Sequence, residues 1–410
     1  MREDSEEFIQ APLSSLVQKG RKITYGIVQP GQFVEDGVIL VRGRDYSAGW
    51  RDLDGFKRVT PEIDAPYKRS KLRAGDLVIT IVGANTGTVA VVPDWLEGAN
   101  ITQTTARVAV EPTKAEPGFV EQVLRSALGQ REVYRYQKGG AQPGLNLADL
   151  EKFSIPLPSL PEQRKIAAIL RTWDEALERL NALRAAKARR LEGLTQTTIG
   201  RGGVFPEHWQ QKPLSKVCTP VKRKSSGGDH PVMTISAKSG FLMQADKFAR
   251  NMAGRSVERY TLLQEGEFAY NKGNSKTAPY GCVFRLERDT ALVPFVYYCF
   301  ALKPGLDPEF YDHLFSAGAL NHQLSRLINS GVRNDGLLNL YSDDFFSCRV
   351  PVPPIEEQRR IAQALTTAKR ELSLLDEEIA ALTDQKRGLM QKLLTGEWRV
   401  EVSDDEEAAA

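Results

Sequence analysis

The chain has 410 residues, of which 41% are hydrophobic and 26% are charged, and its net charge is +3. This composition is ordinary for a globular protein with room for two or three domains. It excludes a membrane-spanning helix, because no apolar run approaches the roughly 18 residues that such a helix needs, while the mild positive charge neither requires nor excludes a nucleic-acid partner.

The N-terminus and the cysteines predict a cytoplasmic protein. Met1-Arg-Glu-Asp-Ser-Glu-Glu is acidic and has no signal-peptide pattern. The cysteines are scattered without a Cys-x-x-Cys pair, so we expect reduced thiols in place of a disulfide framework or a zinc site. They are Cys218, Cys282, Cys299 and Cys348.

Residues 1–158 are expected to form a first mixed domain. Two β-branched runs, 76–82 and 88–92, flank the polar turn Gly83-Ala-Asn-Thr-Gly87, which predicts a β-hairpin. A further strand is expected at 107–111. The apolar spacing from Gly118 to about Tyr136 predicts a helix.

Residues 159–199 are expected to form a long helix. Ser159 suits the N-cap position, and Glu162 completes a Ser-x-x-Glu capping box. A heptad seam then runs through Ile166, Leu170, Trp173, Leu177 and Leu180, is interrupted at Arg184 and Lys187, and resumes at Leu191 and Leu194. A helix of this length cannot bury its apolar stripe alone, so it needs a partner helix.

The chain then repeats itself after the linker Gly200-Arg-Gly-Gly. The segment from Ser159 to Leu170 returns as Pro354 to Leu365, with Gln163 matching Gln358 at a shift of 195 residues. Three further pairs match, namely 8–14 with 209–215, 75–79 with 266–270, and 139–146 with 330–339. Between these anchors the two halves differ strongly in sequence.

The second half is therefore expected to repeat the first. Residues 200–353 comprise the linker and a second domain, and 354–398 form a second long helix. Its seam is Ile361, Leu365, Ala368, Leu372, Leu375, Ile379 and Leu382, with a break at Lys386 before Leu389 and Leu393. The two helices match in length and stripe, and we expect them to pack on each other in antiparallel fashion. The acidic tail 399–410 is expected to be disordered.

These motifs together resemble the specificity subunit of Type I restriction-modification systems. The likeness rests on the two Pro-x-Pro…Glu-Gln-Arg-x-Ile-Ala segments with their long helices, on the Gly-Asp-Leu and Gly-Glu-Phe strands, and on the restart at Trp209. It implies an α+β fold of two tandem mixed α/β target recognition domains, separated by two long helices packed as an antiparallel coiled coil. Each domain would recognise one half of a bipartite double-stranded DNA target.

No catalytic motif was found. The chain lacks an Asn-Pro-Pro-Tyr-like segment, a phosphate-binding Gly-x-x-x-x-Gly-Lys loop and any metal-ligand spacing, so no metal or cofactor is expected on it. The resemblance implies that two methyltransferase subunits and restriction (translocase/nuclease) subunits bind to it. Those partners would carry S-adenosylmethionine, ATP and Mg, and adenine N6-methylation and cleavage would be theirs. No membrane partner is expected.

Loops that mix cations, aromatic residues and amides are the predicted DNA contacts, because these side chains bind phosphates and recognise base edges. In the first domain they are Lys22, Tyr25, Arg44, Tyr46, Trp50, Asn85, Thr86, Lys138 and Gln142. In the second they are Lys222, Arg223, Lys224, Lys238, Lys272, Asn274, Ser275, Lys276, Arg333 and Asn334. A solvated surface is the plainer interpretation of each cluster.

The repeated Glu-Gln-Arg segments have two interpretations. They could dock one partner subunit each, or they could serve the start of the helix. The residues are Glu162, Gln163, Arg164, Glu357, Gln358 and Arg359. For the whole chain, two alternatives stay open, namely a specificity subunit of a related restriction-modification architecture and a tandem-domain scaffold that never touches DNA.

Overall fold

The structure is a computed structural model that describes residues 8–140, 143–200, 203–247, 258–273, 277–328 and 337–402. The chain divides into two compact units. The first unit comprises Met1–Asn181 and Glu377–Ala410, and the second comprises Ala182–Asp376. Each unit therefore takes residues from both long helices, so its globular part and the adjoining helix segments form one body.

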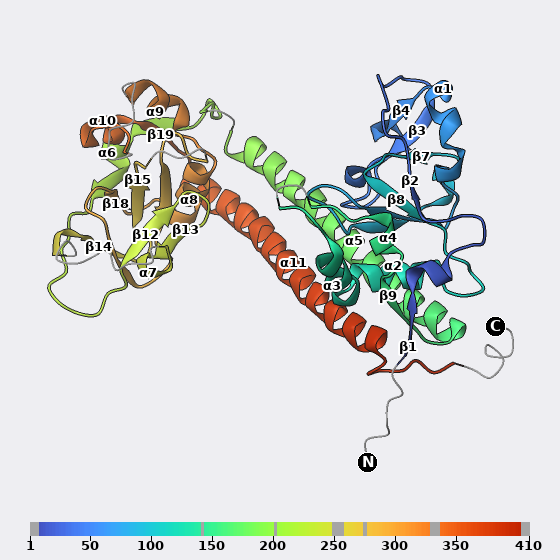
Figure 1. Cartoon of the computed structure of the whole chain (residues 1–410). Helices are drawn as coiled ribbons and strands as arrows, with labels where there is room; N and C mark the ends of the chain where they lie inside the picture. The colour runs from blue at the N-terminus through green and yellow to red at the C-terminus, as the bar shows by residue number, and fades with distance from the viewer. Residues whose placement is uncertain are drawn as a thin grey trace, which may run out of the picture. The chain divides into compact units, whose positions relative to one another are not determined.

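The first unit is built on a four-stranded antiparallel sheet of order β2-β8-β5-β6 (Figure 1). Its strands are β2 (Thr24–Tyr25), β5 (Leu77–Thr80), β6 (Val89–Val91) and β8 (Thr105–Val108). A three-stranded sheet of order β4-β3-β7 is formed by β3 (Val38–Val41), β4 (Lys57–Val59) and β7 (Asn100–Ile101). Two short helices lie between the strands of the first unit: α1 (Pro61–Asp64) follows β4, and α4 (Leu147–Leu150) comes later in the chain.

The predicted hairpin is confirmed, and the predicted helix that follows is broken in two. Strands β5 and β6 pair with Leu77 opposite Val91. The helix expected from Gly118 to Tyr136 is α2 (Pro117–Arg125) followed by α3 (Ala127–Tyr136). Ser126 separates them because its backbone is extended, with φ −70° and ψ 171°, and its hydroxyl accepts a hydrogen bond from Leu128 N at 3.1 Å. An N-capping serine inside the apolar pattern therefore starts a new helix.

The second unit repeats this plan with a four-stranded sheet of order β11-β18-β15-β16. Its strands are β11 (Cys218–Pro220), β15 (Phe268–Asn271), β16 (Cys282–Arg285) and β18 (Tyr298–Leu302). Two antiparallel two-stranded sheets are added. The strands β12 (Met233–Ser236) and β13 (Gly240–Met243) form one, and β14 (Thr261–Gln264) and β17 (Thr290–Val293) form the other. The helices are α6 (Leu214–Val217), α7 (Gln244–Lys247), α8 (Pro308–Ser316), α9 (Asn321–Leu327) and α10 (Ser342–Ser347).

A two-stranded sheet precedes each long helix. In the first unit β1 (Ile9–Pro12) pairs with β9 (Ser154–Leu157), and in the second β10 (Gln210–Pro213) pairs with β19 (Arg349–Val352). Both pairs are antiparallel, and each brings the first strand of a unit beside the strand that leads into the helix. The sequence matches 8–14 with 209–215 and 75–79 with 266–270 thus correspond to equivalent strands.

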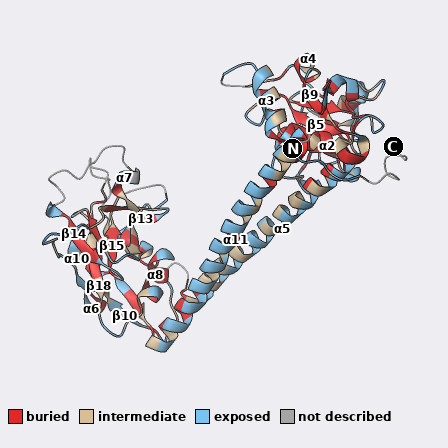
Figure 2. Ribbon diagram, turned by 90° about the horizontal axis from the view of Figure 1, so that it is seen from below, coloured by how far each residue is buried: buried red, intermediate tan, exposed pale blue. Residues whose placement is uncertain are grey.

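The long helices are α5 (Leu160–Thr198) and α11 (Ile355–Thr395), and they run antiparallel. Within the first unit Lys386 Nζ lies 2.6 Å from Asp174 Oδ1. Within the second unit Lys187 Nζ lies 2.8 Å from Glu371 Oε2, and Arg184 pairs with Asp376. The residues at which the apolar seam is interrupted are therefore the residues that form ion pairs across the helix interface. Figure 2 shows that much of the surface of both helices is exposed.

The end of α11 and the segment after it complete the first unit. Leu393 and Leu394 are 4% and 0% exposed and belong to the core that contains Ile166 and Leu170 of α5. Arg399 then donates two hydrogen bonds to the Glu162 carboxylate, at 2.8 and 3.0 Å. Part of the segment expected to be a disordered tail, up to residue 402, is thus placed against the start of α5.

Two further observations concern the chain as a whole. Within the described ranges, no helix is long and apolar enough to span a membrane. Burial raises the pKa of the Cys218 and Cys299 thiols to about 12, so neither is a reactive thiolate at neutral pH.

Candidate nucleic-acid interface

The structure brings two of the predicted loops of the first unit together. The hairpin turn 83–87 lies against the loop 138–144, since Gly83 N donates to Pro143 O at 2.9 Å. The Thr86 hydroxyl donates to the same carbonyl at 3.0 Å and to Gly83 O at 2.7 Å. Asn85 is exposed at the turn. Two loops that are more than 50 residues apart in sequence thus present one polar surface.

Lys138 joins this surface beside a carboxylate. Its side chain is 70% exposed and its Nζ lies 3.1 Å from Asp149 Oδ2. The hydrogen bond from Lys138 lowers the pKa of the Asp149 carboxyl. The lysine of this pair is exposed although the carboxylate is largely buried, so the ammonium group stays accessible to a phosphate. Gln142, predicted on the same loop, lies outside the described residues.

In the second unit the equivalent loops are joined by an equivalent backbone hydrogen bond. In the first unit Leu145 N donates to Ile81 O at 2.7 Å, and in the second Leu338 N donates to Lys272 O at 2.8 Å. Lys272 Nζ lies 5.2 Å from the centre of the Tyr298 ring and 3.5 Å from its hydroxyl. The predicted contacts Asn274, Ser275, Lys276, Arg333 and Asn334 lie outside the described residues.

Other predicted contacts of the first unit divide into exposed and buried side chains. Lys22 and Arg44 are exposed, and Tyr25 is 36% exposed at the end of β2. Trp50 is half-buried, with its indole N–H donating to Val91 O at 2.9 Å. The first three can meet a ligand without rearrangement, whereas Trp50 is held by the sheet edge.

Tyr46 has a structural position. It is 3% exposed and its hydroxyl lies 2.8 Å from Thr80 Oγ1. Burial raises the pKa of this phenol to about 12. The aromatic character that suggested a DNA contact is explained here by core packing, and a contact with bases would require the side chain to leave the core.

Arg223 also has a structural position, in an ion pair that the sequence analysis did not predict and that Arg21 repeats in the first unit. Arg223 donates to both carboxylate oxygens of Glu267, at 3.1 and 2.9 Å. Arg21 likewise donates one hydrogen bond to each carboxylate oxygen of Asp76, both at 2.7 Å. These pairs tie the first segment of each unit to the turn before β5 or β15. The sequence signal for these two ion pairs was the recurrence of an arginine, since Arg223 follows Arg21 by 202 residues.

Three of the predicted cations of the second unit are exposed. Lys222 and Lys238 are exposed. Lys224 is exposed as well, but its Nζ donates to the carbonyls of Arg259 and, at 3.3 Å, Tyr260. Lys222 and Lys238 are thus the second-unit cations best placed to bind a phosphate without losing a contact.

The glutamines of the repeated Glu-Gln-Arg segments are buried and act as clamps. Gln163 donates to Pro158 O at 2.9 Å and accepts from Glu116 N at 2.9 Å. Gln358 donates to Pro353 O at 2.7 Å and accepts from Asp307 N at 2.9 Å. Both are 1% exposed. This placement supports the second interpretation of the segment, in which it fixes the start of the long helix to the N-terminus of α2 or α8.

The neighbours of the clamps differ in exposure. Glu162 is 6% exposed; it accepts from the Ser159 backbone N–H at 3.2 Å, as half of a capping box would, and is paired with Arg399. Glu357 is half-buried and lies 3.4 Å from His208. Arg164 and Arg359 are exposed. Docking of a partner subunit stays a prediction, and these two arginines are the members of the set that could reach one.

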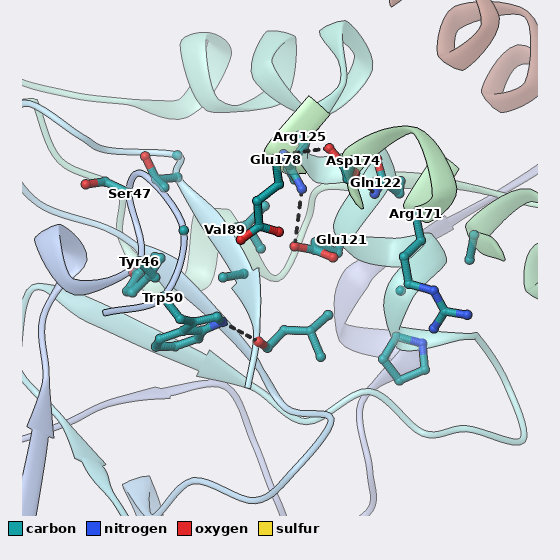
Figure 3. A pocket seen from close by; sticks show the side chains of 18 of the residues that line it. Tyr46, Ser47, Trp50, Val89, Glu121, Gln122, Arg125, Arg171, Asp174 and Glu178 are labelled. Carbon is teal, nitrogen blue, oxygen red and sulfur yellow. Dashed lines mark hydrogen bonds and ion pairs between the residues drawn. The ribbon is translucent and has the colours of Figure 1, made fainter. Parts of the chain in front are cut away.

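A groove of about 1080 Å³ lies in the first unit between the hairpin turn, α2 and α5 (Figure 3). Arg125 crosses it, with nitrogens 3.6 Å from Glu121 and 3.4 Å from Asp174. The charged lining residues are Arg125, Arg164, Arg171, Glu116, Glu121, Asp174, Glu175 and Glu178. Desolvation raises the pKa of the Glu121 carboxyl. With more carboxylates than guanidinium groups, the groove does not suit a phosphate backbone.

Comparisons with known proteins agree on one family. The family model of the Type I restriction modification DNA specificity domain matches residues 59–186. The Type I restriction enzyme EcoBI specificity subunit of Escherichia coli is 32% identical over 211 residues, which are 50% of this chain and 43% of that protein. The chain thus aligns with less than half the length of that relative. The EcoKI specificity subunit of Escherichia coli K12 is 21% identical over 99% of this chain and 94% of the relative.

Solved structures share the fold. The S subunit of a Type I restriction-modification system from M. genitalium matches with a TM-score of 0.59 and 14% identity, over 98% of this chain and 99% of that one. A chain from a structure concerned with complex assembly and conformational transition of the type I R-M system matches with a TM-score of 0.53 and 17% identity, over 96% and 99%. At these identities the likeness concerns the fold alone.

Proposed function

Because the chain belongs to the family of Type I restriction-modification specificity subunits, we propose that it supplies the DNA sequence specificity of such a complex. Each unit recognises one half of a bipartite target on double-stranded DNA. The chain is non-catalytic, as its family is. Two methyltransferase subunits and restriction subunits bind beside it in the cytoplasm and supply the chemistry that uses S-adenosylmethionine, ATP and Mg.

The observation that carries the proposal is a repeated frame with different loops. Both units have the bidentate arginine–carboxylate pair, the glutamine clamp and the bonded turn-and-loop pair at equivalent positions. The side chains on the loops differ between the units, with Asn85 and Lys138 in one and Lys272 in the other. A constant frame with different polar loops suits a protein that recognises two different short sequences.

The exposed side chains suit two kinds of contact. Lys22, Arg44, Lys222 and Lys238 suit phosphates, which fix position without sequence information. Asn85 offers the amide that pairs with adenine in the major groove. Binding should therefore weaken steeply with salt, because each neutralised phosphate releases counterions. A scaffold that does not bind DNA would show no such dependence.

The test is co-expression with the methyltransferase encoded by the adjacent gene, followed by single-molecule sequencing of host DNA for N6-methyladenine. We expect a bipartite motif, and replacing residues 206–347 with the equivalent segment of a relative should change one half-site only. A stable complex without new methylation would favour the scaffold or an inactive relative. A motif that is not bipartite would favour a related architecture.

A second experiment tests whether the paired helices fix the separation of the half-sites. Deleting residues 176–182 together with 378–384 removes one heptad from each helix and keeps the ion pairs of Asp174, Arg184 and Lys187. Seven residues span about 10 Å of helix, which is about three base pairs of DNA. We expect unchanged half-sites with a shorter spacer. Changed half-sites with an unchanged spacer would contradict this role.

A further inference from the structure

Among the described residues, three ion pairs that join α5 to α11 have no copy in the repeat. They are Asp174–Lys386 in the first unit, and Arg184–Asp376 and Lys187–Glu371 in the second. The 195-residue shift between the two halves gives the equivalent positions. At those positions the charged residues of each pair are replaced by other residue types. The two long helices therefore differ in their interface residues, although the two units share the same arrangement of strands and helices.

The cations are replaced by apolar residues. Lys386 corresponds to Leu191, because 386 − 195 = 191. Arg184 corresponds to Ile379 and Lys187 to Leu382, because 184 + 195 = 379 and 187 + 195 = 382. Leu191, Ile379 and Leu382 are half-buried members of the seam. Each interruption of the seam in one helix is thus an apolar seam position in the other.

The carboxylates are replaced as well. Asp174 corresponds to Lys369, because 174 + 195 = 369, while Asp376 corresponds to Asn181 and Glu371 to Ala176. If a second copy of α11 took the place of α5, Lys386 would meet Lys369 in place of Asp174. If a second copy of α5 took the place of α11, Asp174 would meet Leu191.

The pair with the greatest weight is Asp174–Lys386. The Lys386 side chain is 9% exposed and that of Asp174 is 27% exposed. Asp174 also accepts from Gln122 Nε2 at 2.9 Å and lies 3.4 Å from Arg125. A buried charge left without its partner is strongly unfavourable, whereas the more exposed pairs count for less.

We propose that these ion pairs select the partner of each long helix, so that α5 pairs with α11 and the identical helices of two copies of the chain do not pair with each other. A single polar residue in an apolar helix seam can fix register and partner in this way. If the proposed function holds, the consequence is that each molecule carries two different recognition units, whereas pairing of identical halves would produce a protein for a symmetric target. The helix pairing itself does not depend on that function.

The test uses two full-length copies with different affinity tags, co-expressed in one cell. After capture on the first tag, recovery of the second tag should stay at background for the native chain. In the variant that combines Asp174→Ala, Arg184→Ile, Lys187→Leu and Lys386→Leu, the seam becomes apolar and the selection is removed. This variant should keep its helical circular dichroism, since apolar residues can replace buried ion pairs without loss of stability.

We expect recovery of the second tag to rise at least tenfold in the apolar variant. The matched control is Arg387→Ala, since Arg387 is next to Lys386 but its side chain is 75% exposed. A folded apolar variant with background recovery would overturn the proposal. DNA plays no part in this readout, so its failure would leave the proposed function standing.

If the apolar variant does not fold, a charge-reversal variant tests whether the ion pair selects the partner helix. Lys386→Asp alone places its new carboxylate beside that of Asp174. This variant should either show a weaker helical circular dichroism signal or give a higher recovery of the second tag. Adding Asp174→Lys restores an ion pair with the opposite orientation, and native behaviour should return. A double variant that behaves like the single one would show that the pair does not select the partner.

Discussion

His313 gives the sharpest prediction of how the second unit responds to acid. This residue of α8 is 5% exposed, and its Nε2 lies 2.9 Å from Thr366 Oγ1 of α11. Burial, with Lys369 and Arg285 nearby, lowers its pKa from 6.5 to about 4. The folded chain therefore holds a neutral imidazole where the unfolded chain would take up a proton.

The sign and size follow from this difference. Because the folded pKa is the lower one, the unfolded state binds more protons between pH 6.5 and 4, and the free energy of unfolding falls as the pH falls through that window. One pH unit corresponds to about 1.4 kcal/mol, so stability between pH 6.5 and 5 falls by up to about 2 kcal/mol. The raised pKa of the neighbouring Asp312 acts in the opposite direction.

The substitution His313→Gln isolates the histidine, because it leaves Asp312 in place. Gln122 occupies the equivalent position of the first unit, so the helix accepts this side chain there. We expect the variant to lie within about 1 kcal/mol of the native chain at pH 7.5, since an amide can keep the hydrogen bond to Thr366. At pH 5 the native chain should have lost about 2 kcal/mol more than the variant.

The assay is urea unfolding monitored by Trp209 fluorescence, with the other tryptophans replaced by phenylalanine. Trp209 is 4% exposed and packs 5.9 Å from the Phe310 ring of α8, so it reports on the second unit. Two kcal/mol corresponds to a midpoint shift of roughly 1 M urea at an m-value near 2 kcal/mol/M. Parallel pH profiles of the native chain and the variant would refute the reasoning.

Three other predictions concern the repeated frame. Gln163→Ala and Gln358→Ala should each lower the free energy of unfolding by about 2–4 kcal/mol, because each leaves a buried backbone N–H and a carbonyl unpaired. Thermal or urea unfolding measures this change, and an unchanged midpoint would contradict the structural role of the glutamine. Arg223→Ala should cost about 1–3 kcal/mol, because Glu267 loses its partner, while Lys222→Ala stays within about 0.5 kcal/mol, and equal effects would contradict the structural role. Arg399→Ala should speed proteolysis after residue 395 several-fold, and an unchanged rate would contradict its role in holding that segment.

The sequence was sufficient for the features that depend on periodicity and repetition. The extent of α11 follows from apolar spacing, which reports a buried stripe directly, and the hairpin of β5 and β6 follows from two β-branched runs around a polar turn. The antiparallel direction of the helix pairing was expected from the tandem repeat of the two halves. The division of α2 from α3 was missed because Ser126 fits the helical pattern while its hydroxyl caps the next helix. Propensity cannot decide between these two uses of a serine.

The candidate site was less accessible because its contacts join distant segments. Nothing near Gln163 in sequence indicates that its amide bonds to Pro158 and Glu116. The sequence therefore left docking and a role at the start of the helix open as two interpretations of this residue. Arg223 was predicted to contact DNA for the same reason, since a cation in a loop has the same pattern whether or not a carboxylate 44 residues away binds it. Exposure, which separates these cases, is a property of the folded chain.

The placement of Leu393, Leu394 and Arg399 in the first unit has a consequence for biosynthesis. A ribosome makes the globular part of that unit first, but the residues that complete its core emerge last. Until then Ile166 and Leu170 lack part of their apolar cover, and the nascent chain must stay unaggregated through the synthesis of the whole second unit. A transcript cut short before codon 377 therefore yields an incomplete first unit as well as a truncated α11, even when both globular parts are encoded.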